Sequence, residues 1–380
     1  MKSVFLAFLF SFSLMLSLPA QSHIDFKSLE WKQLLRQAAE EDKLIFLDAY
    51  ASWCGPCKMM DKKVFTDAKV AAFYNQNFVN AQIDMEKGEG PKLAEKYEVR
   101  AYPTLLFINS RGDVIHRSLG YHDPDAFLEL GQQALDPQRS LAAMDARYQK
   151  GERDPDFLRK YAEMRYEIFD DSHLPVVEAY LRTQKDWTSP ENMEFIFRYM
   201  ESADSKLFDF VVEHRTDFNE AFGKEVVDDR LESLLVNRAM GMSDEAEVEA
   251  LFRKHLPEEA DVLMLRYRTF KARATKNYNA YAGYALEYAE RVPMSWEELN
   301  GLAWDFYQLL DDKKLLKKGV KLAQKSVALN KNYYNMDTLA ALYHKLGKKG
   351  KADKIAREAI ELAKAEGMDY SETEQFLRSK

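Results

Sequence analysis

The stretch Trp53-Cys54-Gly55-Pro56-Cys57-Lys58 contains both cysteines of the 380-residue chain. Two thiols separated by a Gly-Pro pair can close a disulfide with little rearrangement of the backbone. If Cys54 begins a helix, the unpaired amides and the helix dipole favour its thiolate, so we predict that Cys54 is the nucleophile. Cys57 would lie one turn inside the helix and be less exposed. It would then attack the mixed disulfide that Cys54 forms with a substrate.

Two other roles for the cysteine pair remain open, a metal site and an inert structural disulfide. A structural zinc site needs four ligands, and the chain has seven scattered histidines, no His-x-x-x-His motif and no second cysteine pair. We therefore predict no metal site and no cofactor other than a redox-active disulfide.

The segments around the cysteines predict an α/β domain. Apolar residues from Phe26 to Ala38 recur at helical spacing, and 44–50 is an apolar run that contains only one acid, Asp48. Further strands are expected at 78–84, 105–108 and 114–119, with helices at 59–74, 92–97 and 124–135. In the first of these helical regions, 59–74, the helix is expected to break near Phe65, with Thr66 as the cap of the next helix. Helices that alternate with strands and end in a hairpin indicate a mixed central sheet with helices on both faces.

Beyond Pro137 the strand signals disappear and helical periods continue to the end of the chain. The last ninety residues repeat, because Asn300-Gly301-Leu302-Ala303-Trp304 matches the segment 337–341 and Ser326-Val327-Ala328-Leu329 matches 359–362. The two offsets differ by four residues, which predicts an insertion at 311–314. A helix–turn–helix unit of about 34 residues is the pattern of tetratricopeptide repeats. We expect a domain at 23–136, helical hairpins at 137–290 and tetratricopeptide-like repeats at 291–380.

The N-terminus indicates export. Lys2 is followed by an apolar run, 4–18, that is short for a bilayer span, and Ala20-Gln21-Ser22 offers small residues for a signal peptidase. We expect 1–22 to be a removed signal peptide, which leaves a periplasmic or secreted protein with no membrane span. An uncleaved membrane anchor is the alternative. The net charge of −8 and the lack of a basic cluster argue against a nucleic-acid partner.

The sequence Trp-Cys-Gly-Pro-Cys-Lys at 53–58 is similar to the active site of the thioredoxin family, and the likeness extends over about 24–135. The resemblance implies that Asp48, six residues before Cys54, is a buried acid that handles the proton of Cys57. It also implies that Pro103 in Tyr102-Pro103-Thr104 is a cis proline facing the disulfide. An exposed strand-end acid and an ordinary trans proline are the alternatives.

The substrate surface is expected to include Trp53, Gly55 and Pro56 from the cysteine loop and Tyr102 and Thr104 from the proline loop. Trp53 could instead be a core aromatic, as Tyr50 is expected to be. The chain departs from the family at three positions. Lys62 replaces the kink proline of the active-site helix, as in the periplasmic thioredoxin-like domains of membrane thiol transporters. Asn80 replaces a lysine beside the buried acid, and Tyr102 replaces a smaller residue before the proline.

These observations predict an exported thiol:disulfide oxidoreductase that mainly reduces disulfide-containing client proteins. Its compartment is oxidising, so it needs an electron donor, which the resemblance suggests is a membrane thiol transporter. A disulfide isomerase or oxidant is one alternative. The other is an interaction protein whose helical repeats bind a protein partner while the thioredoxin module is passive.

Overall fold

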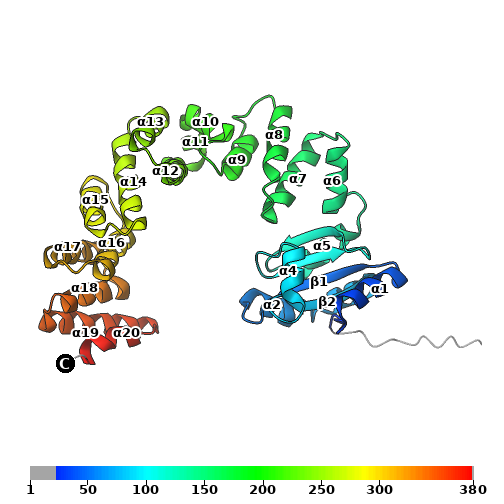
Figure 1. Ribbon diagram of the computed structural model, residues 1–380, viewed down its shortest axis with the longest axis horizontal. Helices are drawn as coiled ribbons and strands as arrows, with labels where there is room; N and C mark the ends of the chain where they lie inside the picture. Colours follow the sequence, from blue (N-terminus) through cyan, green and yellow to red (C-terminus); the bar gives the residue numbers. More distant parts are fainter. Residues whose placement is uncertain (1–22, 379–380) are drawn as a thin grey trace, which may run out of the picture. The chain divides into compact units, whose positions relative to one another are not determined.

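The computed structural model describes residues 23–378 (Figure 1). The predicted signal peptide at 1–22 lies outside these residues. The chain divides into two compact units after Trp187. The first unit contains the α/β domain and three further helices, and the second is all helical within the described residues. The expected boundaries at 136/137 and 290/291 stay predictions.

The α/β domain is built on a four-stranded mixed sheet with the order β2-β1-β3-β4. Strands β1 and β2 are parallel, and the β1–β3 and β3–β4 pairs are antiparallel. The elements of the domain are α1 (Trp31–Glu41), β1 (Leu44–Tyr50), α2 (Gly55–Lys63), α3 (Ala68–Asn77), β2 (Phe78–Asp84), α4 (Gly90–Lys96), β3 (Thr104–Ile108), β4 (Val114–Leu119) and α5 (Pro124–Leu135). The predicted mixed sheet with helices on both faces is confirmed.

Strand β1 is central because both of its faces are buried. Phe46 packs in an aromatic cluster with residues of α2, α3 and α5, whereas Leu47 packs in a second cluster with residues of α1 and α4. Side chains alternate along a strand, so Asp48 lies on the same face as Phe46 and points toward the layer that contains α2. The carboxyl group of Asp48 is therefore enclosed between β1 and this helical layer and has no contact with solvent.

Helix starts agree with the sequence where a capping residue is present. Asp123 accepts a hydrogen bond from the amide of Ala126 and begins α5, as expected. The expected cap of α3 is wrong by one residue, because the side chain of Asp67 accepts from the amide of Val70 whereas the hydroxyl of Thr66 donates to the carbonyl of Lys62. An aspartate carboxylate competes better than a threonine hydroxyl for two adjacent amides. Helix α1 is shorter than the apolar pattern suggested and begins at Trp31.

Three helices follow the sheet domain within the first unit. They are α6 (Leu141–Gln149), α7 (Pro155–Glu167) and α8 (His173–Thr183). Helix α6 packs against the edge strand β4, and α7 and α8 form an antiparallel pair (Figure 1). The edge strand β4 is thereby in contact with a helix that follows the sheet domain.

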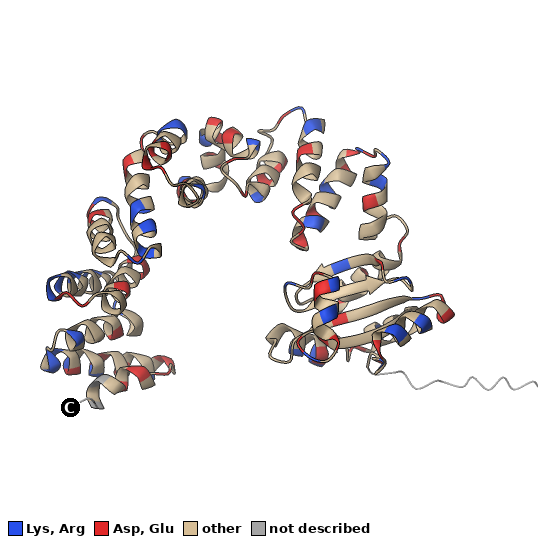
Figure 2. Cartoon of the chain, in the orientation of Figure 1, with Lys and Arg blue, Asp and Glu red and all other residues tan. Residues whose placement is uncertain are grey.

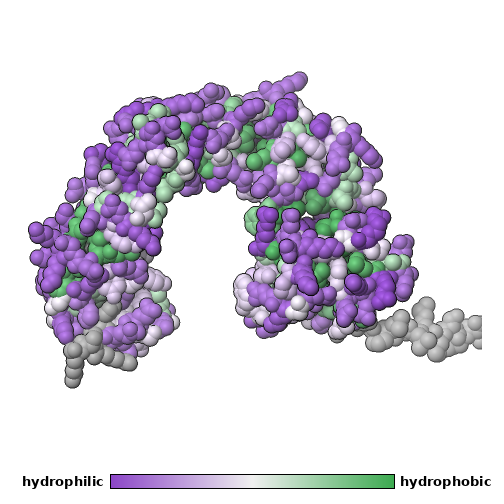
Figure 3. Space-filling view, in the orientation of Figure 1, coloured by the Kyte–Doolittle hydropathy of each residue, from purple (hydrophilic) through white to green (hydrophobic). Residues whose placement is uncertain are grey.

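The second unit consists of twelve helices within the described residues. They are α9 (Pro190–Tyr199), α10 (Lys206–Glu213), α11 (Arg215–Phe222), α12 (Lys224–Met240), α13 (Glu245–His255), α14 (Ala260–Ala274), α15 (Tyr278–Arg291), α16 (Trp296–Leu309), α17 (Lys313–Leu329), α18 (Tyr333–Lys345), α19 (Lys349–Glu366) and α20 (Ser371–Arg378). Acidic and basic residues are interspersed along these helices (Figure 2), and hydrophilic residues cover most of the surface visible in Figure 3.

The repeated segment forms two helical hairpins, α16–α17 and α18–α19. Helix α18 begins 37 residues after α16, and α19 begins 36 residues after α17. Three residues connect the helices of each hairpin, so the insertion predicted at 311–314 is wrong. The matched segment at 359–362 lies one helical turn too early, because an amphipathic helix matches itself about as well after a shift of one turn.

Candidate active site

The two cysteines lie at the start of α2, directly after the loop that leaves β1. Cys54 is the N-cap of α2, and its Sγ lies 3.1 Å from the backbone nitrogen of Cys57, which donates to it. Pro56 occupies the first turn, where its missing amide hydrogen removes no helical hydrogen bond. Cys54 and Cys57 form a disulfide with an S–S distance of 2.05 Å. The helix start therefore holds the pair in the position that favours a thiolate on Cys54 once the disulfide is reduced.

Both cysteines are almost fully buried, with exposed fractions of 3% for Cys54 and 2% for Cys57. The expected difference in exposure between them is therefore small. Gly55 and Pro56, which separate them, are exposed, and a Cβ atom on Gly55 would meet no atom within 4 Å. The surface above the disulfide is consequently open at Gly55.

Three aromatic residues, Trp53, Tyr102 and Tyr50, border this surface. Trp53 is 66% exposed, and its ring lies edge-on to the ring of Tyr102 at 5.8 Å. Its indole nitrogen donates to the carboxylate of Glu86 at 2.9 Å, which fixes the side chain although it is exposed. Tyr50 is only half-buried and packs with Tyr102 against the cysteines, so its expected place in the core is wrong. The chain before the cysteines turns at the end of β1, which brings Tyr50 to the rim.

The loop before β3 lies beside this rim. The Tyr102–Pro103 peptide bond is cis, and the carbonyl of Pro103 accepts from the amide of Gly120 at 2.9 Å. Thr104 is buried, and its hydroxyl donates to the carbonyl of Ala101 at 2.7 Å. The buried side chain of Thr104 thus holds the loop in place through this hydrogen bond. The residue of this loop that lies on the rim is Tyr102, beside Trp53.

Asp48 is fully buried and carries an unusual protonation equilibrium. Its Oδ2 accepts from the side-chain amide of Gln82 at 3.0 Å, whereas its Oδ1 has no hydrogen-bond partner among the described residues. Burial raises the pKa of Asp48 to about 7; the hydrogen bond from Gln82 opposes this shift, and the charge of Asp61 adds to it. A carboxyl group with this pKa can both release and accept a proton near neutral pH.

Gln82 and Asp61 complete the surroundings of Asp48, and sequence reasoning missed both. The amide of Gln82 also donates to Oδ1 of Asp61 at 2.7 Å, so it bridges the two carboxyl groups. Asp61 lies on α2 four residues after Cys57, which is one turn farther along the same helix face. Asp61 is partly exposed, so the bridge connects the buried acid with the surface.

The prediction that Asn80 stands beside Asp48 is wrong. In the parallel register of β1 and β2, Asp48 is opposite Gln82, and Asn80 is opposite Phe46. The amide of Asn80 donates instead to the carbonyl of Tyr74 at 3.3 Å and to Asn75 at 3.1 Å. The neighbour of the buried acid is therefore a neutral hydrogen-bond donor two residues later in the strand.

Within residues 23–378, no group of three or more His, Cys, Asp or Glu side chains is placed to hold a metal ion. In the same range no helix is both long and apolar enough to cross a bilayer.

Comparison with known proteins finds relatives of the α/β domain. Residues 31–135 match the family described as a thioredoxin-like domain. Thioredoxin-1 of Drosophila melanogaster is 45% identical over 73 residues, which are 19% of this chain and 64% of that protein. The thiol:disulfide interchange protein DsbD of Haemophilus influenzae is 36% identical over 112 residues, which are 28% of this chain and 19% of that protein. The chain thus spans less than two thirds of either relative.

A solved structure covers the same part of the chain. The solution structure of a candidate disulphide-isomerase from Bacteroides thetaiotaomicron is 47% identical and covers 31% of this chain and 98% of that one, with a TM-score of 0.29. The family match and these relatives cover the region that contains the cysteine pair.

Proposed function

We propose, from the thioredoxin-like domain that residues 31–135 form, that this protein is a thiol:disulfide oxidoreductase. The observation that carries the proposal is the buried pair Cys54–Cys57 at the start of α2, with a carboxyl group of raised pKa, Asp48, behind the same helix. A passive structural disulfide would need neither a proton acceptor with a pKa near 7 nor an aromatic rim around an open surface.

We propose that the reaction is mainly the reduction of disulfides in client proteins. The thiolate of Cys54 attacks one sulfur of a client disulfide, a bond forms between them, and the other client sulfur leaves as a thiolate that takes a proton from solvent. Cys57 then loses its proton to the carboxylate of Asp48 and attacks Sγ of Cys54. This attack forms the Cys54–Cys57 disulfide and breaks the bond between Cys54 and the client, whose second sulfur leaves as a thiolate and takes a proton from solvent. The client thus gains two electrons and becomes a dithiol, and Cys54 and Cys57 lose two electrons and become a disulfide. Gln82 holds one oxygen of Asp48, so the oxygen without a partner is the one that takes the proton.

The surface that receives the client consists of Trp53, Gly55 and Pro56 on one side and the loop of Tyr102 and Pro103 on the other. The exposed aromatic ring of Trp53 and the open space above Gly55 support this assignment. Thr104 is assigned a supporting role, because its hydroxyl fixes the loop from inside through the carbonyl of Ala101.

The same protein must be reduced again after each turnover. We propose a dithiol donor of the membrane thiol-transporter class, a role supported by the similarity to the thiol:disulfide interchange protein DsbD. The signal-like sequence at 1–22 supports export to the periplasm or to the exterior. Outside the cytoplasm, such a donor is required because the surroundings are oxidising.

Reduction of insulin by the purified protein, with dithiothreitol as the donor, tests the activity. Cys54→Ser should abolish it, and Cys57→Ser should trap clients as mixed disulfides on Cys54. Because the chain has no other cysteine, every trapped adduct reports this site. Insulin reduction by the wild type that equals that of Cys54→Ser would refute the proposal.

The reduction potential of the Cys54–Cys57 couple decides the direction. A value near about −270 mV, that of thioredoxin, supports a reductase. A value near about −120 mV would instead make the protein an oxidant, and an intermediate value would fit an isomerase.

We propose partner binding by the second unit as a second function, in line with the tetratricopeptide-like hairpins α16–α17 and α18–α19. A pocket of about 520 Å³ between α15 and α17 supports it, because Val292, Met294 and Leu299 line it with the 61%-exposed Leu329. A pull-down of the full chain tests this function. Partners that stay bound after thiol reduction and are lost in Leu329→Asp would support it, and none that behave so would refute it.

A further inference from the structure

A groove of about 370 Å³ lies beside the loop that precedes Pro103. One wall consists of Arg100 and Ala101, directly before Tyr102, and of Leu119 at the end of β4. The opposite wall is the loop 168–171 between α7 and α8. Ala101 is two residues from Pro103, and Leu119 is the partner of Thr104 in the sheet. Consecutive Cα atoms are about 3.8 Å apart, so a chain that passes the disulfide reaches this groove within about two residues.

An exposed aromatic residue stands on the outer wall of the groove. Phe169 is 69% exposed, and its backbone has φ 55°, which is rare for a bulky residue. No described residue covers most of its ring, although an aromatic side chain normally gains free energy by burial. A large apolar surface held open beside a proposed binding site is a typical feature of a contact surface.

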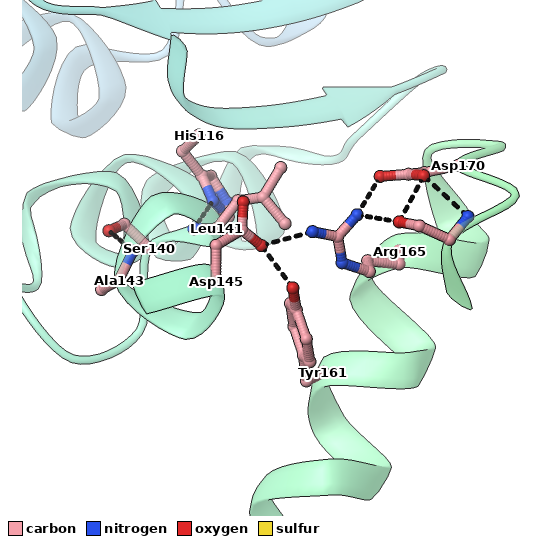
Figure 4. A network of polar contacts seen from close by, with 9 residues as sticks. His116, Ser140, Leu141, Ala143, Asp145, Tyr161, Arg165 and Asp170 are labelled. Carbon is pink, nitrogen blue, oxygen red and sulfur yellow. Dashed lines mark hydrogen bonds and ion pairs between the residues drawn. The ribbon is translucent and has the colours of Figure 1, made fainter. Parts of the chain in front are cut away.

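The loop that carries Phe169 is fixed by a polar network (Figure 4). Asp145 on α6 accepts from the hydroxyl of Tyr161 at 2.5 Å and from the guanidinium of Arg165 at 2.6 Å. Arg165 also donates to the carboxylate of Asp170, the residue after Phe169. Arg165 is only 14% exposed, so its ion pairs are partly shielded from water. The loop is therefore anchored to α6.

Helix α6 is in turn attached to the sheet. The buried His116 on β4 accepts from the backbone amide of Leu141, the first residue of α6, at 3.1 Å. The hydroxyl of Ser140 accepts from the amide of Ala143 at 3.3 Å, which satisfies a second amide of the same turn (Figure 4). Phe169 is thus connected through α7 and α6 to the strand next to Pro103, and the outer wall of the groove is built as part of the sheet domain.

The charges around the groove favour a basic occupant. Four acids line it: Glu98, Asp145, Asp170 and Asp171. Two cations, Arg100 and Arg117, line it as well, and a third, Arg165, lies behind the wall and pairs with Asp145. One negative charge remains in excess. Asp171 is exposed and forms no ion pair within residues 23–378. An aromatic face beside a free carboxylate suits a lysine or arginine side chain, which can contact both.

We propose that this groove binds a lysine or arginine side chain of the client, about two to three residues from the client cysteine that Cys54 attacks. The inference deepens the proposed function and rests on it. The helices after the sheet domain thereby select clients by the sequence that flanks the disulfide, and Phe169 and Asp171 are the residues that do so.

The test uses peptides that carry one cysteine as a mixed disulfide with glutathione. The peptides are identical except for lysine, alanine or glutamate placed two or three residues from the cysteine on either side. The full chain is reduced first, and the second-order rate constant for each peptide is measured by stopped flow. Oxidised glutathione, which has no extended segment, is the reference substrate.

The wild type should react about three- to tenfold faster with the best lysine peptide than with its glutamate counterpart, a ratio that falls at high salt. Phe169→Asn and Asp171→Asn should each bring this ratio toward one while the rate with oxidised glutathione is unchanged. Asparagine tolerates the left-handed backbone at position 169, so the first variant tests the ring and not the fold. Leu135→Ala, which removes an exposed apolar side chain outside the groove, should keep the wild-type ratio.

A wild-type ratio near one, a preference for glutamate, or a lysine preference that survives in both variants would overturn the inference. In each of these cases the protein still reduces oxidised glutathione. Failure to reduce any of the substrates, glutathione included, would instead refute the proposed function. The two failures are therefore distinguishable in one set of measurements.

Discussion

Replacement of Asp48 by asparagine should stabilise the oxidised domain, and by an amount that depends on pH. The carboxyl group is fully buried, and its pKa rises from 3.8 to about 7 because burial disfavours the charged form. The folded state therefore holds a proton that the unfolded state releases between these two values. The free energy of unfolding falls as pH rises through this window, because the folded state binds more protons there.

The size of the effect follows from the pKa difference. Each pKa unit corresponds to about 1.4 kcal/mol, so ionisation of Asp48 costs the folded domain about 4 kcal/mol above pH 7. At pH 4.5 most of this cost is absent, since the folded domain keeps its proton. Asp48→Asn, which has no charge to bury and keeps an acceptor for Gln82, should thus gain about 3 kcal/mol more over the wild type at pH 8.5 than at pH 4.5.

Hydrogen exchange of the β1 and β3 amides measures the stability of this domain without assuming that the whole chain unfolds in one step. The exposed Glu95→Gln is the matched control and should change stability by less than about 0.5 kcal/mol at either pH. A gain for Asp48→Asn that is the same at pH 4.5 and pH 8.5 would refute the raised pKa and, with it, the assignment of Asp48 as proton acceptor.

Three further substitutions test the same domain. Gln82→Leu removes the hydrogen bond that favours the charged carboxylate of Asp48 and should move the pH window of instability upward; Asp61→Asn removes a repelling charge and should move it downward. The two shifts are read from the same exchange experiment, and shifts of equal sign would contradict the bridge. Gly90→Ala should destabilise the domain by about 2–4 kcal/mol, because the added Cβ would lie 2.0 Å from the carbonyl oxygen of Asp84. An unchanged midpoint of denaturation would contradict this contact.

The sequence was most informative where one pattern determines one element. The bounds of β1 and β2 agree with the predicted ranges 44–50 and 78–84, because the first is an apolar run with one acid and the second alternates apolar and polar residues. Helix α5 was predicted at 124–135 because an aspartate cap and a proline mark its start. Local physical chemistry is enough for such elements.

The residues around Asp48 could not be predicted with the same reliability, because they depend on register. Asn80 and Gln82 lie on the same face of β2, and only the pairing of β1 with β2 decides which of them stands opposite the acid. A shift by two residues keeps every apolar side chain on its own face, so the hydrophobic pattern cannot distinguish the two registers. Phe169 was missed for a related reason, since neither its exposure nor its left-handed backbone leaves a pattern in the sequence.

In the proposed mechanism, Asp48 and Gln82 have different roles behind the cysteines: Asp48 accepts and releases the proton, and the hydrogen bond from Gln82 limits the rise that burial causes in the pKa of Asp48. If Gln82 donated to neither carboxyl group, the buried charge on Asp48 would lose its one stabilising contact among the described residues, and the pKa would rise farther from neutrality. If a lysine stood there instead, its charge would lower the pKa and leave a weaker base for the proposed proton transfer from Cys57. A neutral donor that occupies only one oxygen keeps the pKa near 7 and leaves the other oxygen free. That combination is what a carboxyl group needs if it is to accept a proton when the disulfide is formed and release it when the dithiol is restored.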